Sequence, residues 1–419
     1  MNNLLSKIIK SIQWNTFEVF STHVLFMIHN TFLFAMLTAK LFGYSGVIFS
    51  IMYTSVSLLS FGFISGLSSF LLQATASQYC MATILFPQML FSLFIYSLIS
   101  PCIVYIILTY SPHISHQTTL LIISIIPLEL IRKLCKTVLQ LSFYNRSTAI
   151  SETFLSMTYM GMVWGYWYIH NSLSLELLLT ALFVGSLGAT SYNLYHMYQL
   201  YQSRPTSPTS SSQQHTAETN YSILKKRCST ALVDLSHQLF SANIFIPLGA
   251  LYWDHTTIAY LKYSNNLIYS LSSIIRKIFG SPLATLLLHT TDTRTTIHAL
   301  TTLFKRSALC LLAISLTGLL CLSCTHNTQA IACFFITLLL HISELLFFMY
   351  ETVLITHNKT DLSRNISCVM IAIIIPIYYK IATLPIFLLC PIIMIRIACL
   401  IYIHRNTATI SSPLGENFT

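Results

Sequence analysis

The sequence predicts an all-α polytopic membrane protein of about twelve transmembrane helices in two six-helix bundles (6+6). Hydrophobic residues make up 54% of the 419 residues and charged residues only 8%, whereas soluble domains carry about a quarter charged residues. Too few charges remain to cover a water-soluble fold of this size, so the apolar surface must face lipid. The formal charge of +10 does not indicate nucleic acid, because the basic residues lie between apolar stretches rather than on one face.

A polar segment near the middle of the chain, residues 202–222, predicts the division into two halves. It is rich in Ser, Thr and Pro and contains almost no apolar side chain, so burial cannot offset the entropy lost on ordering it. Long apolar runs dominate both flanks. The segment therefore predicts a cytoplasmic linker between an N-terminal six-helix bundle, 1–201, and a C-terminal six-helix bundle, 223–419.

Six apolar stretches in each half approach or exceed the roughly 20 residues that a helix needs to cross a membrane. In the first half the predicted spans are 14–39, 44–73, 81–108, 118–141, 151–169 and 173–199. In the second half they are 231–253, 258–289, 307–323, 330–350, 366–379 and 383–404. The third span contains Pro87 and Pro101, which are compatible with a helix because proline is common in membrane spans. The fourth is apolar at first and basic later, and the eighth is unusually long.

The basic residues predict the orientation of these spans. If the N-terminus is cytoplasmic and the spans alternate, sixteen of the 22 Lys and Arg residues fall on the cytoplasmic side. Three lie within spans, and the three that fall outside are Lys40, Lys262 and Lys380. This bias is the one that the positive-inside rule demands. We therefore expect both termini and the linker to be cytoplasmic.

Motifs of soluble enzymes are absent from the sequence. It contains no G-x-x-x-x-G-K-[ST] phosphate-binding loop, no G-x-S-x-G elbow and no H-E-x-x-H zinc motif. The single C-x-x-C pair, Cys321 and Cys324, lacks the second pair that a zinc site would need. We expect no catalytic residues, no cofactor and no metal site, and we expect gradients or substrate concentration to supply the energy.

Ionisable residues inside the predicted spans are candidate functional residues, because each is costly in a membrane and needs a partner or a water-filled path. His341 and Glu344 lie three residues apart on one span, which predicts either a proton relay or a structural hydrogen-bonded pair. Glu18 and Asp234 lie near the cytoplasmic start of the first span of each half. They are candidates for ion coupling, although the helix dipole favours carboxylates there in any case.

Four basic residues are candidates for a cargo-binding cavity. Arg276 and Lys277 lie roughly 18 Å from the cytoplasmic end of their span, with apolar sequence on both sides and no acidic residue within helical reach. We predict that they line a central cavity together with Arg132 and Arg396. In the alternative interpretation the span ends just after Lys277, at the lipid head groups. For Arg132 the alternative is neutralisation by Glu129, three residues earlier.

Two six-span halves around a linker are typical of transporters built from structural repeats. Residues 41–46, Leu-Phe-Gly-Tyr-Ser-Gly, followed by Gly62 and Gly66, resemble the first turn and second span of the polysaccharide flippases. Segments 250–264 and 280–283 resemble that family's turn between the seventh and eighth spans and its later proline. The first turn lacks the family's proline. The family belongs to the multidrug/oligosaccharidyl-lipid/polysaccharide (MOP) exporter superfamily.

The resemblance implies an alternating-access flippase of the bacterial inner (cytoplasmic) membrane that exports a lipid-linked oligosaccharide or polysaccharide precursor. It implies a lipid-linked sugar substrate, membrane lipids and polysaccharide assembly proteins as partners, and we expect a monomer that binds no nucleic acid. One alternative is a multidrug or cation antiporter of the same superfamily, which predicts carboxylates rather than cations in the cavity. Another is a membrane polymerase or glycosyltransferase, which predicts a large external loop. No predicted outer loop exceeds roughly a dozen residues, so we expect a transporter and not an enzyme.

Overall fold

The fold is described here from a computed structural model. The described residues are 13–60, 78–110, 114–142, 144–202, 241–289, 328–356, 364–373 and 394–399, with Lys10, Phe63 and several positions between 231 and 239. All regular structure within these ranges is helical. Predicted span 307–323 and the larger part of 383–404 lie outside them.

The chain begins with one continuous helical stretch over residues 13–36. It passes from an α-helical segment into a short π-helix and back, and the two named elements are η1 (Phe20–Val24) and α2 (Leu25–Met36). The next helix is α3 (Ala39–Leu59). Between them, Leu37 and Thr38 have extended backbone angles, and Thr38 Oγ1 accepts a hydrogen bond of 3.3 Å from the backbone N–H of Leu41.

The capping by Thr38 corrects the predicted boundary between the first two spans. A side-chain oxygen at this position satisfies one of the free N–H groups at a helix start, so the helix begins directly after it. The sequence predicted a turn at 40–43, and this is wrong, because those residues form the first turn of α3. Gly43 and Gly46 are therefore helical residues whose lack of a side chain permits close packing, not turn residues.

Four long helices complete the first half: α5 (Gln78–Tyr110), α6 (His116–Leu141), α7 (Asn145–His170) and α8 (Leu175–Gln202). They correspond to the third to sixth predicted spans, and Pro87 and Pro101 lie inside α5 as expected. Ser115 caps α6 by accepting a hydrogen bond of 3.1 Å from Thr118 N. Asn171, with φ 51°, ends α7 in the left-handed conformation, which Asn tolerates better than most residues.

The second half contains α10 (Ala242–Gly249), α11 (His255–His289) and α13 (Thr328–Thr356), with helical segments at 364–373 and 394–399. Asp254 caps α11: its carboxylate accepts hydrogen bonds from the hydroxyl of Thr257 and, at 3.2 Å, from the backbone N–H of Thr257. These bonds favour the ionised form and lower the pKa of the Asp254 carboxyl. The unusual length of the eighth span is confirmed, and α11 continues without a break past Arg276 and Lys277.

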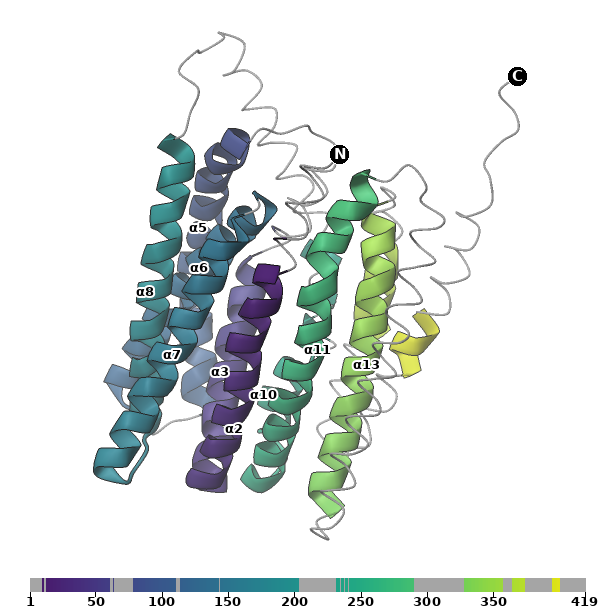
Figure 1. Ribbon diagram of the computed structural model, residues 1–419. Coiled ribbons are helices and arrows are strands. Elements are labelled where there is room, and N and C mark those ends of the chain that lie inside the picture. The colour runs from purple at the N-terminus through teal and green to yellow at the C-terminus, as the bar shows by residue number, and fades with distance from the viewer. Residues whose placement is uncertain are drawn as a thin grey trace, which may run out of the picture.

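The helices run roughly side by side, with α5 to α8 on one side of the molecule, α2 and α3 in the middle, and α11 and α13 on the other side (Figure 1). Helix α6 is the centre of the first bundle, because a series of its apolar side chains is fully buried: Ile122, Ile125, Ile126, Leu130 and Leu134. Helix α5 instead exposes large apolar side chains, among them Phe86, Phe94, Leu98 and Tyr105.

Exposed apolar faces of this kind fit a lipid environment. In the described part of the chain, five helices are long and apolar enough to cross a membrane. Helices α6 and α7 are not among these five, and they carry the buried charges described below. The protein is therefore a multi-pass membrane protein whose lipid-facing helices surround a charged interior.

The two halves contact each other through α2 and α3 on one side and α10 and α11 on the other. Phe34 stacks on Tyr263 with ring centroids 4.5 Å apart. Asn266 Nδ2 donates a hydrogen bond of 3.0 Å to Asn30 Oδ1. A Cβ atom at Gly43 would lie only 3.0 Å from the backbone oxygen of His255, so glycine is what lets α3 approach the start of α11.

Candidate functional site

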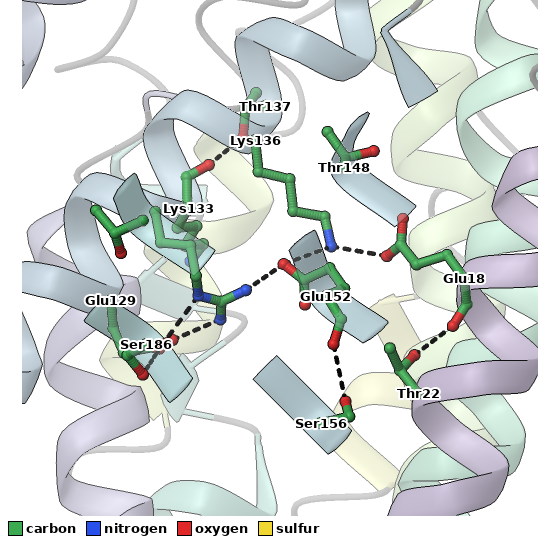
Figure 2. A network of polar contacts seen from close by, with 12 residues as sticks. Glu18, Thr22, Glu129, Lys133, Lys136, Thr137, Thr148, Glu152, Ser156 and Ser186 are labelled. Carbon is green, nitrogen blue, oxygen red and sulfur yellow. Dashed lines mark hydrogen bonds and ion pairs between the residues drawn. The ribbon is translucent and has the colours of Figure 1, made fainter. Parts of the chain in front are cut away.

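A buried ion network joins the helices of the first half (Figure 2). Its basic side comes from α6, where the helical period places Arg132, Lys133 and Lys136 within one turn of each other and Glu129 one turn before them. Its other carboxylates come from α7 and from the segment that precedes η1, which contribute Glu152 and Glu18.

Arg132 forms the first part of the network. Its Nε lies 3.1 Å from Glu129 Oε1 and its Nη2 lies 2.5 Å from Glu129 Oε2, so the guanidinium binds this carboxylate with two nitrogens. Its Nη1 donates to Glu152 Oε1. Ser186 of α8 donates a further hydrogen bond of 2.5 Å to Glu129 Oε1. The three-residue spacing thus correctly predicted the pair with Glu129, and α7 supplies a second carboxylate that the spacing could not show.

Lys136 forms the second part. Its Nζ lies 2.7 Å from Glu18 Oε1 and 3.2 Å from Glu152 Oε1. Glu152 therefore joins the two parts by accepting from both cations. Lys133 points to a different helix and donates a hydrogen bond of 3.2 Å to Ser57 of α3.

The cluster contains three carboxylates and the cations Arg132, Lys133 and Lys136, so its charges balance when all these groups are ionised. The carboxylates are strongly buried: the side chains of Glu18, Glu129 and Glu152 are 1%, 4% and 10% exposed. Transfer of such groups from water is costly, and the ion pairs and hydrogen bonds must offset that cost. The arrangement can hold the helices in register, and it can bind or release a proton only by unbalancing a buried pair.

A second polar cluster lies between α11 and α13. His341 Nε2 lies 3.0 Å from Asn265 Oδ1, which is an acceptor, so Nε2 carries a hydrogen. His341 Nδ1 lies 3.1 Å from Glu344 Oε2. The predicted pair of His341 and Glu344 is therefore formed.

Solved structures identify the fold. No protein-family model matches the sequence, and no curated protein sequence matches it either. The eukaryotic MATE transporter AtDTX14 is similar in structure, with a TM-score of 0.68 at 12% sequence identity over 98% of this chain and 97% of that chain. The chain has a MATE-type transporter fold.

Two further structures agree with the MATE-type fold. An outward-facing multidrug resistance MATE family transporter of the MOP superfamily has a TM-score of 0.59 at 11% identity, over 97% of both chains. The MATE transporter ClbM in complex with Rb⁺ has a TM-score of 0.58 at 10% identity, over 96% of this chain and 94% of that chain. These likenesses show the fold alone, and the fold is one that MATE transporters of the MOP superfamily share. They do not single out the polysaccharide flippases.

Of the other predicted site residues, Arg396 is placed by the structure. It is 1% exposed, and its guanidinium carbon lies 5.6 Å from the centroid of the Phe347 ring on α13. The backbone of Arg276 and Lys277 lies in α11, but their side chains are outside the described part of the chain, as is all of Asp234. Their roles stay predictions.

Two functional candidates of this MATE-type fold were missed by the sequence analysis. Glu152 lies at the expected start of the fifth span and was not considered, although the rule that intramembrane acids need partners would have selected it. Lys262 was counted among the outside residues, but the structure buries it between the two halves, with 6% of its surface exposed. No local pattern in the sequence indicates that α3 covers it.

Proposed function

We propose that this protein is an exporter that moves a lipid-linked oligosaccharide or polysaccharide precursor across the bacterial inner membrane by alternating access. The MATE-type fold supports transport by two half-bundles that move relative to each other. The proposal of an anionic cargo rests on one observation. Each of the four interior carboxylates that the structure describes lies within 3.2 Å of an Arg, Lys or His nitrogen.

This pairing matters because a cationic drug needs a carboxylate as its counter-ion. To reach Glu18, Glu129 or Glu152 it would have to displace Arg132 or Lys136, which would strand that cation at a cost of several kcal/mol. A phosphate-bearing lipid has no such requirement. It would bind cations outside the network, and Arg276, Lys277 and Arg396 are our candidates.

Arg276 is the residue that we expect to contact the cargo's pyrophosphate. A planar guanidinium can bind two phosphate oxygens at once, which an ammonium cannot. Arg276 and Lys277 point about 100° apart on a helix, so we expect one of them to face the cavity. Arg132 contributes less to cargo binding in this proposal, because two carboxylates already accept from it.

His341 and Glu344 are the proposed coupling site. They lie 3.1 Å apart in the second half, and a proton bound or released by the pair during transport would change its charge. The ring of Tyr269 lies 5.9 Å from the His341 ring and 6.3 Å from the ring of His23 in the first half. A change of charge there would thus alter a cluster that reaches the contact between the halves. Glu18 and Asp234 are further coupling candidates, and Glu18 would act through its ion pair with Lys136.

Deletion of the gene tests the proposal. We expect lipid-linked oligosaccharide to accumulate in the inner leaflet and one surface polymer to disappear, and we expect the wild-type gene to restore the polymer.

Variants of Arg276 expressed in the deletion strain test the residue proposed to contact the cargo. The Arg276→Ala variant should fail to restore the polymer while the protein remains in the membrane, and the Arg276→Lys variant should restore part of it. Labelling of surface glycans and membrane immunoblots measure both quantities. Unchanged surface glycans after deletion would contradict the proposal.

A multidrug or cation antiporter is the second candidate, and the fold favours it because a similar structure is a multidrug resistance transporter and another holds Rb⁺. The same deletion strain separates the two functions. Hypersensitivity to cationic dyes with normal surface glycans would support the antiporter. Loss of the polymer with unchanged dye tolerance would support the flippase.

A further inference from the structure

Lys262 lies about two turns inside α11, at the place where this helix packs against α3 of the other half. It is 6% exposed. A Cβ atom at Gly46 would lie 2.8 Å from Lys262 Cγ and 3.2 Å from its Cβ and Cδ, so the lysine stem occupies the space that Gly46 leaves open. Within the described part of the chain, the Lys262 ammonium forms no ion pair and no hydrogen bond.

A buried lysine without a partner is unusual because an uncompensated charge is costly away from water. Lysines near a helix end commonly extend their ammonium group to the membrane surface. The stem of Lys262 is held between the two halves, against Gly46. An anion bound between the halves would compensate its charge.

The facing side of α3 offers further unused donors. Gly43, Gly46, Ser50 and Thr54 recur at three and four residues and share one face of the helix. Gly43 lies against the start of α11 and Gly46 against Lys262, so the two helices run in the same direction. The hydroxyls of Ser50 and Thr54 are buried and have no hydrogen-bond partner in the described residues.

The hydroxyls of Ser50 and Thr54 lie on the same face of α3 as Gly46, which packs against Lys262. Since both helices rise by the same amount per residue, Ser50 lies one turn beyond Gly46, towards Asn266 on α11. Thr54 lies one further turn along the same face of α3.

We infer that Lys262, with the hydroxyls of Ser50 and Thr54, forms a phosphate-binding subsite between the two halves. The subsite is covered when α3 and α11 are in contact, and it accepts a phosphate or pyrophosphate group when they separate. This inference rests on the proposed function in identifying the anion as the cargo's phosphate. Its chemistry is shared by a phospholipid head group, and the experiment distinguishes the two sources.

The test measures binding of inorganic pyrophosphate to the purified full-length protein in a neutral detergent. We expect pyrophosphate to raise the melting temperature of the wild-type protein and to bind measurably by calorimetry. Lys262→Met keeps the apolar stem against Gly46 and removes the charge. It should weaken binding by at least about tenfold, as for one lost hydrogen bond to a charged group. Lys262→Arg should retain binding within a few-fold, because it keeps the charge.

One control variant and one further variant of the subsite complete the test. Lys40→Met makes the same change in net charge at an exposed position at the start of α3 and should leave binding unchanged. Ser50→Ala removes a hydroxyl that has no partner in the described residues, so the protein should fold normally while pyrophosphate binding weakens. Ser50→Ala also keeps the test valid if Lys262→Met fails to fold. Equal loss of binding in Lys40→Met and Lys262→Met would overturn the subsite.

The source of the anion is determined in lipid nanodiscs of phosphatidylcholine, with or without phosphatidylglycerol. Stabilisation by phosphatidylglycerol that requires Lys262, without any effect of pyrophosphate, would support the subsite and assign it to a lipid head group. If neither pyrophosphate nor phosphatidylglycerol has an effect that depends on Lys262, the inference is overturned. Binding does not depend on export, so a deletion strain with normal surface glycans would reject the proposed function and leave the subsite standing.

Discussion

At the scale of single residues, Glu152 determines whether the ion network is one unit or two. Its Oε1 accepts from Arg132 and lies 3.2 Å from Lys136 Nζ. Each cation keeps one other carboxylate, Glu129 for Arg132 and Glu18 for Lys136. The neutralising charge of Glu152 is therefore shared, and its removal leaves the network with an excess of positive charge inside the bundle.

Substitution of Glu152 by Gln should destabilise the protein strongly. Gln has the same shape, so the change removes the charge and leaves the packing intact. Removal of one partner from a buried ion pair costs about 3 to 5 kcal/mol. A clear fall in the melting temperature of the detergent-solubilised protein measures this. Glu176→Gln is the matched control, because Glu176 is exposed in the first turn of α8 and should change stability by less than about 0.5 kcal/mol. Equal melting temperatures for the two variants would show that the network is not stabilising.

At the scale of helices, glycines on α8 set how closely it packs on α7. A Cβ atom at Gly185 would lie 2.9 Å from Leu155 Cδ1 and 3.1 Å from the Leu155 backbone oxygen. The side chain of Leu155 can rotate away, but the backbone oxygen belongs to α7 and can move only with the helix. Gly185 therefore fixes the distance between the two helices that carry Glu152 and Ser186.

Gly185→Ala should push α7 and α8 apart. Overpacking of this kind typically costs about 1 to 3 kcal/mol, and it should also lengthen the hydrogen bond from Ser186 to Glu129. Gly161→Ala on α7 is the matched control, since a Cβ atom there meets nothing within 4 Å. It should be neutral or stabilise the helix by up to about 1 kcal/mol, because Ala is a better helix former than Gly. Thermal unfolding of both variants decides the matter, and a Gly185→Ala variant as stable as Gly161→Ala would contradict the packing argument.

The sequence allowed the helices to be predicted better than the contacts between them. Apolar length alone located α6 within two residues at its start and identified α11 as unusually long. Three-residue spacing found the pair of Glu129 and Arg132, because both residues lie on one helix. The start of α3 was missed because a single cap at Thr38 outweighs the apolar pattern around it.

The remainder of the candidate site depends on which helices touch, and local periodicity does not contain that information. Lys136 and Glu18 are 118 residues apart in the chain and meet only because the N-terminal helical segment packs near α6. Lys262 is a further example. Its position near the start of its span suggested a residue outside the membrane. Only the contact with Gly46 of α3 shows that the other half covers it.

At the scale of the whole molecule, the two halves are joined by contacts of α2 and α3 with α10 and α11. These contacts follow α11 from His255, which faces Gly43, through Lys262 to Asn266, which bonds to Asn30. In Figure 1, α2 ends and α11 begins at the lower end of the molecule. In the proposed orientation this is the outer side, so export requires these contacts to separate in each cycle.

Cross-linking the two halves at this contact should therefore stop export. The side-chain amides of Asn30 and Asn266 lie 3.0 Å apart, so cysteines at both positions are within reach of a short bifunctional methanethiosulfonate. We expect the treated double-cysteine variant to lose the surface polymer, as in the deletion strain, and a reducing agent to restore it. Each single-cysteine variant, treated in the same way, should export normally.

A second cysteine pair controls for the reagent and for simple stiffening of the protein. Ser21 Oγ and Thr153 Oγ1 lie 2.7 Å apart, and both residues belong to the first half. A cross-link between cysteines at these positions joins helices that move together in alternating access, so export should continue. If cross-linking Asn30→Cys to Asn266→Cys leaves export intact, the contact of α2 and α3 with α11 does not open during transport. The subsite at Lys262 would then have no route of entry, because its burial is relieved only by that opening.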